Sequence, residues 1–80
     1  MEQVVLYSSD NCQECERARM LLESIKCNYL EYKLNKDFTN KQFVAEFGKS
    51  ASLPQFSFGY RHIGGLKETL QYLKQKNLIK

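Results

Sequence analysis

The chain has little of what marks a secreted or membrane-bound protein. Its 80 residues include only three cysteines, an odd number that makes a poor framework of structural disulfides. No apolar run approaches the length that crosses a membrane, and the sequence opens Met-Glu-Gln, without a charged-then-apolar leader. We therefore expect a cytoplasmic protein with no membrane partner, in a compartment where free thiols persist.

An excess of charge of one sign is also missing. Twelve Lys and Arg against nine Asp and Glu give a net charge of only +3. We interpret the lysines near the C-terminus, and Arg17 and Arg19 earlier in the chain, as solvated helix faces, and expect no nucleic-acid partner. What the chain does have is 42% apolar residues, with five Phe and five Tyr, which predicts one small folded domain.

The chain is organised around the motif Cys12-Gln13-Glu14-Cys15. Before it, residues 3–7 are apolar and rich in β-branched and aromatic side chains, which predicts a buried strand. After it, helical periodicity predicts a helix over residues 12–26, with its apolar face on Ala18, Leu21, Leu22 and Ile25. The turn between them offers candidate N-cap oxygens on Ser8, Ser9, Asp10 and Asn11.

This placement favours thiol–disulfide exchange. The first N–H groups of a helix lack partners and carry partial positive charge, so they stabilise a thiolate at Cys12. Cys15 lies three residues further on the same helical face, within reach of a mixed disulfide at Cys12. We predict that Cys12 is the attacking nucleophile and Cys15 the resolving thiol.

A metal site is the alternative, because zinc proteins use the same cysteine spacing. Cys27 or His62 would then complete the ligand set, or two chains with glutathione would share an iron–sulfur cluster. The sequence has no second close ligand pair, so we favour the redox function and expect no bound metal. Cys27 is predicted to be a small buried side chain, and His62 a surface or hydrogen-bonded histidine rather than a ligand or general base.

The remaining pattern predicts an α/β protein with the order β-α-β-α-β-β-α. After the first helix, the expected elements are a strand at 29–34, a helix from Thr39 or Asn40 to Gly48 with Phe43, Val44 and Phe47 in the core, strands at 55–58 and 61–63, and a helix opened by Gly64-Gly65 with Leu66, Leu70 and Leu73 on its apolar face. A helix between two strands makes them parallel, and the turn at 59–60 makes an antiparallel hairpin. We expect one mixed four-stranded sheet with helices on both faces.

Separated segments together resemble a glutaredoxin of the short, dithiol, bacterial or phage-like kind. They are Val5-Leu6-Tyr7 leading to Cys12-Gln13-Glu14-Cys15, then Leu53-Pro54-Gln55-Phe56, and then His62-Ile63-Gly64-Gly65. The resemblance covers nearly the whole length and implies a thioredoxin-like fold, one domain over residues 1–80, and thiol–disulfide oxidoreductase activity.

The resemblance also implies a glutathione site, with glutathione as a co-substrate rather than a bound cofactor. A cis peptide bond would precede Pro54, and the backbone of Leu53 would pair with glutathione or a substrate peptide. Gly64 and Gly65 would let the backbone approach the γ-glutamyl carboxylate of glutathione at the start of the last helix. Lys67 would hold a carboxylate of glutathione. Tyr7, at the end of the first strand and close to the dithiol, would either only pack or bring its hydroxyl near the sulfurs and the substrate.

The chain departs from the family pattern at that site. Cys-Gln-Glu-Cys replaces the usual Cys-Pro-Tyr-Cys, and Glu14 opposes both thiolate formation and glutathione carboxylates. Lys67-Glu68 replaces a usual pair of aspartates. A glutaredoxin-like electron donor that thioredoxin reductase recharges therefore remains an alternative. The resemblance suggests protein clients such as ribonucleotide reductase and a monomeric state.

Overall fold

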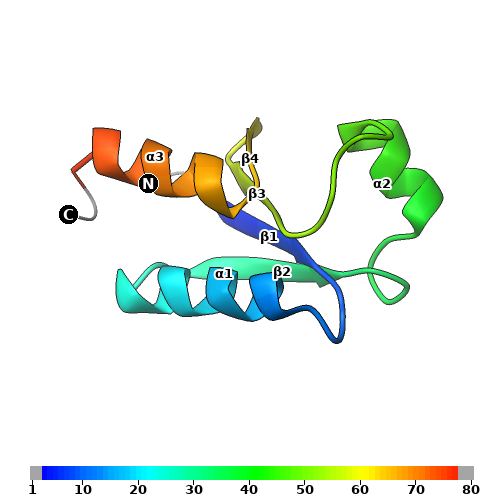
Figure 1. Cartoon of the computed structure of the whole chain (residues 1–80), viewed down its shortest axis with the longest axis horizontal. Coiled ribbons are helices and arrows are strands. Elements are labelled where there is room, and N and C mark those ends of the chain that lie inside the picture. The colour runs from blue at the N-terminus through cyan, green and yellow to red at the C-terminus, as the bar shows by residue number, and fades with distance from the viewer. Residues whose placement is uncertain (1–2, 78–80) are drawn as a thin grey trace.

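The computed structural model describes residues 3–77 and has the predicted order of elements (Figure 1). The elements are β1 (Val4–Ser8), α1 (Gln13–Ser24), β2 (Tyr29–Lys33), α2 (Asn40–Phe47), β3 (Gln55–Phe58), β4 (Arg61–Gly64) and α3 (Leu66–Gln75). Local signals set several ends: Thr39 caps α2 with its side chain, and Gly48 ends that helix. Element ends move slightly from the predicted bounds, as helix and strand termini often do.

The strands form one four-stranded sheet in the order β2-β1-β3-β4. β1 is parallel to β2, because α1 carries the chain back between them, and it is antiparallel to β3. β3 and β4 form the predicted hairpin, with Gly59 in the turn at a φ of 63°. The mixed sheet is confirmed.

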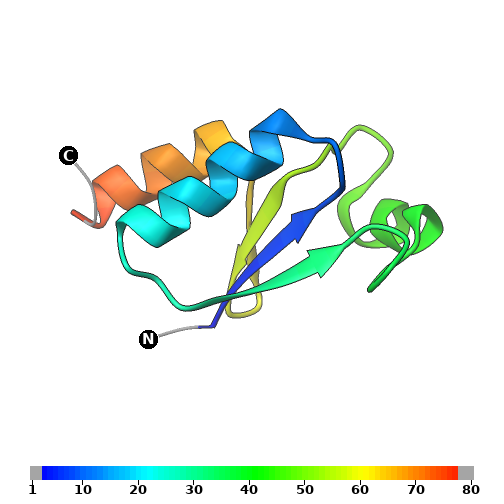
Figure 2. The ribbon, with the colours of Figure 1, turned by 90° about the horizontal axis from the view of Figure 1, so that it is seen from below.

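One face of the sheet is covered by α1 and α3, which lie side by side across it (Figures 1 and 2). Alternate residues of β1 point to this face, because side chains alternate along a strand. The main core contains Val4, Leu6, Ala18, Leu22, Phe56, Phe58 and Leu73. Leu21, Ile25 and Leu66 pack against it as half-buried side chains.

The opposite face contacts α2, so the predicted placement of helices on both faces is confirmed. Tyr7 points to this face and its ring meets that of Phe47, with centroids 5.0 Å apart. In both ribbon views α2 lies beyond the end of the sheet, so it covers only that end (Figures 1 and 2). The side chains of α2 therefore join a second aromatic cluster rather than the main core, made of Tyr7, Tyr32, Phe38, Phe43 and Phe47.

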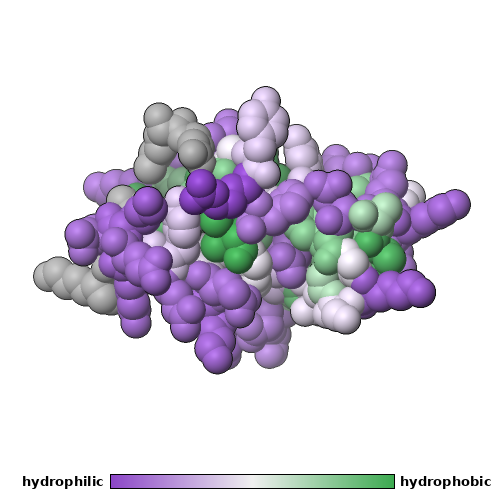
Figure 3. Space-filling view, turned by 90° about the horizontal axis from the view of Figure 1, so that it is seen from above, coloured by the Kyte–Doolittle hydropathy of each residue, from purple (hydrophilic) through white to green (hydrophobic). Residues whose placement is uncertain are grey.

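The surface also differs between the two ends of the molecule. Seen from above, hydrophilic side chains dominate toward the α3 end, whereas hydrophobic side chains show at the end where α2 lies (Figure 3). Lys74 in the last turn of α3 is exposed, as expected for a solvated basic face. Within residues 3–77, no helix combines the length and apolar character needed to cross a membrane.

Candidate active site

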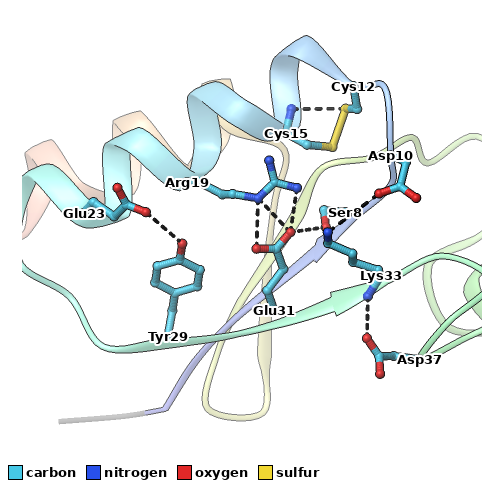
Figure 4. Close-up of polar contacts among 10 residues, drawn as sticks. All are labelled: Ser8, Asp10, Cys12, Cys15, Arg19, Glu23, Tyr29, Glu31, Lys33 and Asp37. Atoms are coloured by element: carbon cyan, nitrogen blue, oxygen red, sulfur yellow. Dashed lines mark hydrogen bonds and ion pairs between the residues drawn. A yellow bond between two sulfur atoms is a disulfide. The ribbon is translucent and has the colours of Figure 1, made fainter.

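Cys12 and Cys15 are joined by a disulfide at the start of α1, with their Cα atoms 5.2 Å apart (Figure 4). Cys12 is itself the N-cap residue: its backbone is extended, and its Sγ accepts a hydrogen bond from the N–H of Cys15 at 3.1 Å. The expectation of an oxygen cap from the preceding turn, with Cys12 inside the helix, is therefore wrong. Asn11 takes a positive φ of 55°, and the helix begins only after Cys12, which leaves the sulfur facing the first free N–H groups.

The two sulfurs differ in exposure. Cys15 is fully buried at 0% exposure, whereas Cys12 is half-buried. An external disulfide therefore meets Cys12 first, and Cys15 is positioned behind it. This asymmetry is what attack by Cys12 and resolution by Cys15 require.

An ion pair lies one helical turn along α1 from Cys15 (Figure 4). The Nε of Arg19 donates to both carboxylate oxygens of Glu31 on β2, at 2.9 and 2.8 Å, and its Nη2 lies 2.7 Å from Oε2. The hydroxyl of Ser8, which is fully buried at the end of β1, donates to the same carboxylate. The predicted solvated role of Arg19 is therefore wrong, because its side chain is only 25% exposed.

Hydrogen bonding fixes the charges of this pair. The bonds from Arg19 hold the pKa of Glu31 below its ordinary value, against the opposing effect of burial. The bond to Glu31 in turn raises the pKa of Arg19. Both groups are therefore ionised at neutral pH. The sequence does not reveal this ion pair, because its members come from three elements and the only local signal is the spacing of four residues between Cys15 and Arg19.

The charge of Glu14, by contrast, lies in solvent. Its carboxylate pairs with Arg17 at 3.2 Å, and the two side chains are 54% and 67% exposed. The solvated role predicted for Arg17 is confirmed. Solvent screening weakens the effect of such a pair on nearby sulfurs.

Two segments with predicted glutathione contacts lie against each other. The peptide bond between Leu53 and Pro54 is cis, as expected, and Pro54 is buried. The carbonyl oxygen of Pro54 lies 3.5 Å from where a Cβ of Gly65 would stand. Gly65 thus lets the β4–α3 junction pass close to the segment before β3.

At the start of α3, one backbone N–H group is already bonded to a side chain of the same helix, that of Glu68. The Oε1 of Glu68 accepts a hydrogen bond from the N–H of Gly65 at 2.9 Å. An incoming carboxylate would have to use the next N–H groups, those of Leu66 and Lys67, which lack acceptors within the helix. The side chain of Lys67 is exposed beside them.

Tyr7 belongs to the aromatic cluster beside α2. Its ring contacts those of Tyr32, Phe38 and Phe47 at centroid distances of 5.6, 5.6 and 5.0 Å. Burial, followed by the charge of Glu46, raises the pKa of its phenol, so the hydroxyl stays protonated. Its predicted contact with substrate stays a prediction.

The two side chains considered as extra metal ligands have other partners. His62 bonds to the hydroxyl of Ser57 through Nδ1 and to Glu46 at 2.7 Å through Nε2. Cys27 packs half-buried against the core, and burial raises the pKa of its thiol. In the described part of the chain, no three His, Cys, Asp or Glu side chains are grouped to hold a metal ion.

Comparison with protein-family models gave one match, to Glutaredoxin, over residues 4–63. These residues make up three quarters of the chain and include β1, the dithiol, the cis proline and most of β4. A search of curated proteins found no match.

Solved structures share the fold. The chain is similar to glutaredoxin 1 from Francisella tularensis, complexed with cacodylate, with a TM-score of 0.78, 24% identity and full coverage of both chains. It is also similar to a buckwheat glutaredoxin–glutathione complex, with a TM-score of 0.78, 20% identity and coverage of 94% of this chain and 71% of that one. For reduced Escherichia coli glutaredoxin, the TM-score is 0.77 at 21% identity, with coverage of 94% and 96%.

Proposed function

Because the chain belongs to the glutaredoxin family and carries a dithiol, it is a thiol–disulfide oxidoreductase, and we propose that glutathione is its electron source. In the proposed cycle, the thiolate of Cys12 attacks a protein disulfide or a glutathione mixed disulfide. Cys15, or a second glutathione, then displaces the product. The protein is thereby an electron carrier in cell redox homeostasis.

The observation that carries the glutathione assignment is the close approach of Pro54 and Gly65. A tripeptide bound by its backbone needs an exposed peptide group on one side and free N–H donors on the other. We assign these two roles to the backbone of Leu53 and to the first N–H groups of α3, because the Pro54 carbonyl lies 3.5 Å from the Cβ position of Gly65. The buckwheat relative was solved as a glutathione complex, which supports the same ligand here.

The charged side chains at the start of α3 also support glutathione as the ligand. Lys67 is an exposed cation in the first turn of α3, where the helix dipole also favours an anion. Glutathione has two carboxylates at opposite ends, and one of them suits this position. The carboxylate of Glu68 suits the ammonium group of the γ-glutamyl residue, so the two side chains match a zwitterion better than a simple anion.

We further propose a cytoplasmic, monomeric protein that acts on protein disulfides, with ribonucleotide reductase as a client of the expected type. The cytoplasm supplies glutathione in its reduced form, which the cycle consumes.

The test is turnover of a small glutathione mixed disulfide with two alternative electron supplies. We expect turnover with glutathione and glutathione reductase, and little with thioredoxin reductase. Turnover with thioredoxin reductase alone would disprove the glutathione assignment while leaving the dithiol function intact.

A matched pair of variants locates the glutathione site. Lys67→Gln removes the cation at the start of α3, and Lys74→Gln removes an exposed cation in its last turn. We expect the KM for glutathione to rise about threefold to tenfold in Lys67→Gln, as for loss of one partly exposed charge contact. Lys74→Gln should keep the original KM. Equal KM values in both variants would exclude Lys67 from the site.

A further inference from the structure

The resolving step requires a negative charge on the buried sulfur of Cys15, and the N–H groups at the start of α1 do not stabilise that charge sufficiently. For Cys15 to attack the sulfur of Cys12, it must lose its proton, since the thiolate is the nucleophile. Cys15 is at 0% exposure, and burial disfavours a charged sulfur. The N–H at the helix start that faces a sulfur bonds to Cys12, not to Cys15. A buried Cys15 thiolate therefore needs another source of positive charge.

Arg19 is such a source. It follows Cys15 by four residues in α1, so the two side chains lie on the same helical face one turn apart. Figure 4 shows its guanidinium between the Cys15 side chain and the carboxylate of Glu31. Its side chain is only 25% exposed, so solvent screens its charge less than that of Arg17.

The ion pair is oriented with respect to the dithiol. Glu31 takes the Nε and Nη2 side of the guanidinium, and the hydroxyl of Ser8 donates from β1 to Oε2, the carboxylate oxygen that both of these nitrogens contact. Among residues 3–77, the remaining amino group, Nη1, makes no hydrogen bond to a protein group. The pair therefore presents its positive end toward α1 and the dithiol, and its negative end toward the sheet (Figure 4).

Other charges near the dithiol are less favourably placed. Glu14 and Arg17 pair with each other in solvent, and Asp10 lies 3.7 Å from the amino group of Lys33. Glu16 is exposed on α1, and at the start of α3 Lys67 and Glu68 are exposed. None of these groups is as little exposed as Arg19 and Glu31, which also lie next to Cys15 on the side of the sheet (Figure 4).

We propose that Arg19 is a positioning residue for the dithiol reaction, stabilising the Cys15 thiolate that resolves the mixed disulfide, and that Glu31 and Ser8 hold it in place. In this step Cys15 gives its proton to solvent, and its thiolate attacks the sulfur of Cys12. The Cys12–Cys15 bond forms as the bond from Cys12 to the substrate sulfur breaks. The substrate leaves with that electron pair as a thiolate and is protonated by solvent.

The test is the pKa of Cys15 in a protein where it is the only thiol. The Cys12→Ser, Cys27→Ala background leaves Cys15 alone, and the ultraviolet absorbance of its thiolate is followed against pH. Glu31→Gln removes the negative end and should lower the pKa, whereas Arg19→Gln should raise it. At a fixed pH below the pKa, each substitution should change the fraction of Cys15 present as thiolate by a factor of about 5. This is the effect expected of one charge several ångströms away in a partly solvated site.

Two further variants separate charge from packing. Arg19→Gln, Glu31→Gln keeps a hydrogen-bonded pair without charge, and should have a pKa between those of Arg19→Gln and the parent protein. Arg17→Gln removes an exposed guanidinium from the same helix and should leave the Cys15 pKa near that of the parent.

A second readout uses the complete dithiol. In equilibrium with reduced and oxidised glutathione, stabilising a thiolate favours the reduced protein. Measured at a pH above the Cys15 pKa found in the first experiment, where the thiolate is populated, the equilibrium constant for reduction should therefore rise about fivefold in Glu31→Gln and fall in Arg19→Gln. Unchanged values, or shifts of the same sign in both single variants, would overturn the proposal. This equilibrium is reached by thiol–disulfide exchange whether or not the protein has a binding site for glutathione. The result therefore does not depend on the proposal that glutathione is the electron source.

Discussion

The sulfur of Cys12 accepts a hydrogen bond from the N–H of Cys15 at 3.1 Å, so the atom that is expected to attack substrate also caps α1. A serine hydroxyl is among the best N-caps, and Cys12→Ser should therefore preserve the helix start. A hydroxyl at this position lacks a base and is a far weaker nucleophile than a thiolate. This substitution removes the chemistry while retaining the local structure.

We predict that Cys12→Ser abolishes reduction of any disulfide, whereas Cys15→Ser keeps activity on glutathione mixed disulfides. In Cys15→Ser, a second glutathione can still displace the first from Cys12, but a protein disulfide is left as a trapped mixed disulfide. Turnover assays with both substrate types distinguish the cases, and circular dichroism checks that each variant is folded. Equal partial losses in the two variants would contradict the assigned roles.

Glu31 gives the protein an acid-sensitive contribution to stability. Its pKa in the folded state is lowered chiefly by the bonds from Arg19, so the folded protein favours the ionised carboxylate. The contribution is present above the pKa of the unfolded chain, about 4.3, and is lost as pH falls through the lower pKa of the folded state.

We predict that the difference in unfolding free energy between the parent protein and Glu31→Gln is largest near neutral pH and shrinks below about pH 4. Urea unfolding at a series of pH values measures it. Glu16→Gln, which removes an exposed carboxylate from α1, is the control and should keep the parent profile. If the difference in unfolding free energy grew as the pH fell, the ionised Glu31 would not be the form that stabilises the folded protein.

At the scale of elements, the junction between β4 and α3 is closely constrained by Glu68. Gly64 has a φ of 127°, and a Cβ placed there would lie 2.9 Å from the Cβ of Glu68. Glu68 is the side chain that accepts the N–H of Gly65. Gly48, at the end of α2, also has a positive φ, at 94°, but a Cβ there would meet nothing within 4 Å. The two glycines therefore separate backbone strain from a steric clash.

We predict that Gly64→Ala destabilises the protein more than Gly48→Ala does. Each alanine carries the strain of a left-handed backbone, on the order of 1 kcal/mol, and Gly64→Ala also displaces Glu68, for a total of about 2–3 kcal/mol. Urea unfolding midpoints measure both changes. Similar losses in the two variants would show that Glu68 moves aside freely.

At the scale of the whole molecule, stability depends on a single small core. In 80 residues, the main core joins two helices to one face of the sheet, and α2 adds only a separate aromatic cluster at the sheet end. Leu73 is fully buried in that core, and Leu66 and Tyr72 of α3 pack against it as half-buried side chains. A domain of this size has a total stability on the order of 4–12 kcal/mol, so one large cavity removes much of it.

We predict that Leu73→Ala costs about 2–5 kcal/mol and lowers the melting temperature sharply. Met20→Ala removes an apolar side chain that is 67% exposed on α1, and should change stability by less than about 0.5 kcal/mol. Thermal unfolding of the two variants tests the assignment of the core. A small loss for Leu73→Ala would mean that α3 is not essential to it.

The order of elements, the position of the dithiol and the turn chemistry could all be predicted from the amino-acid sequence. These features depend on residues close together in the chain: alternation in β3, helical spacing after Cys15, the Thr39 cap and the glycine at 48. The bond preceding Pro54 was predictable only through the family resemblance, since tertiary contacts hold a cis isomer in place.

Which charges and aromatic rings meet could not be predicted before the packing of the elements was known. Arg19 and Glu31 are twelve residues apart and Ser8 lies on a third element, so no local pattern pairs them. Likewise, α2 packs at the end of the sheet because Tyr7 and Phe47 meet there, although the spacing of its apolar residues equally suited the main core. Local propensity selects helix or strand over a few residues, but burial and charge pairing depend on which distant elements come into contact.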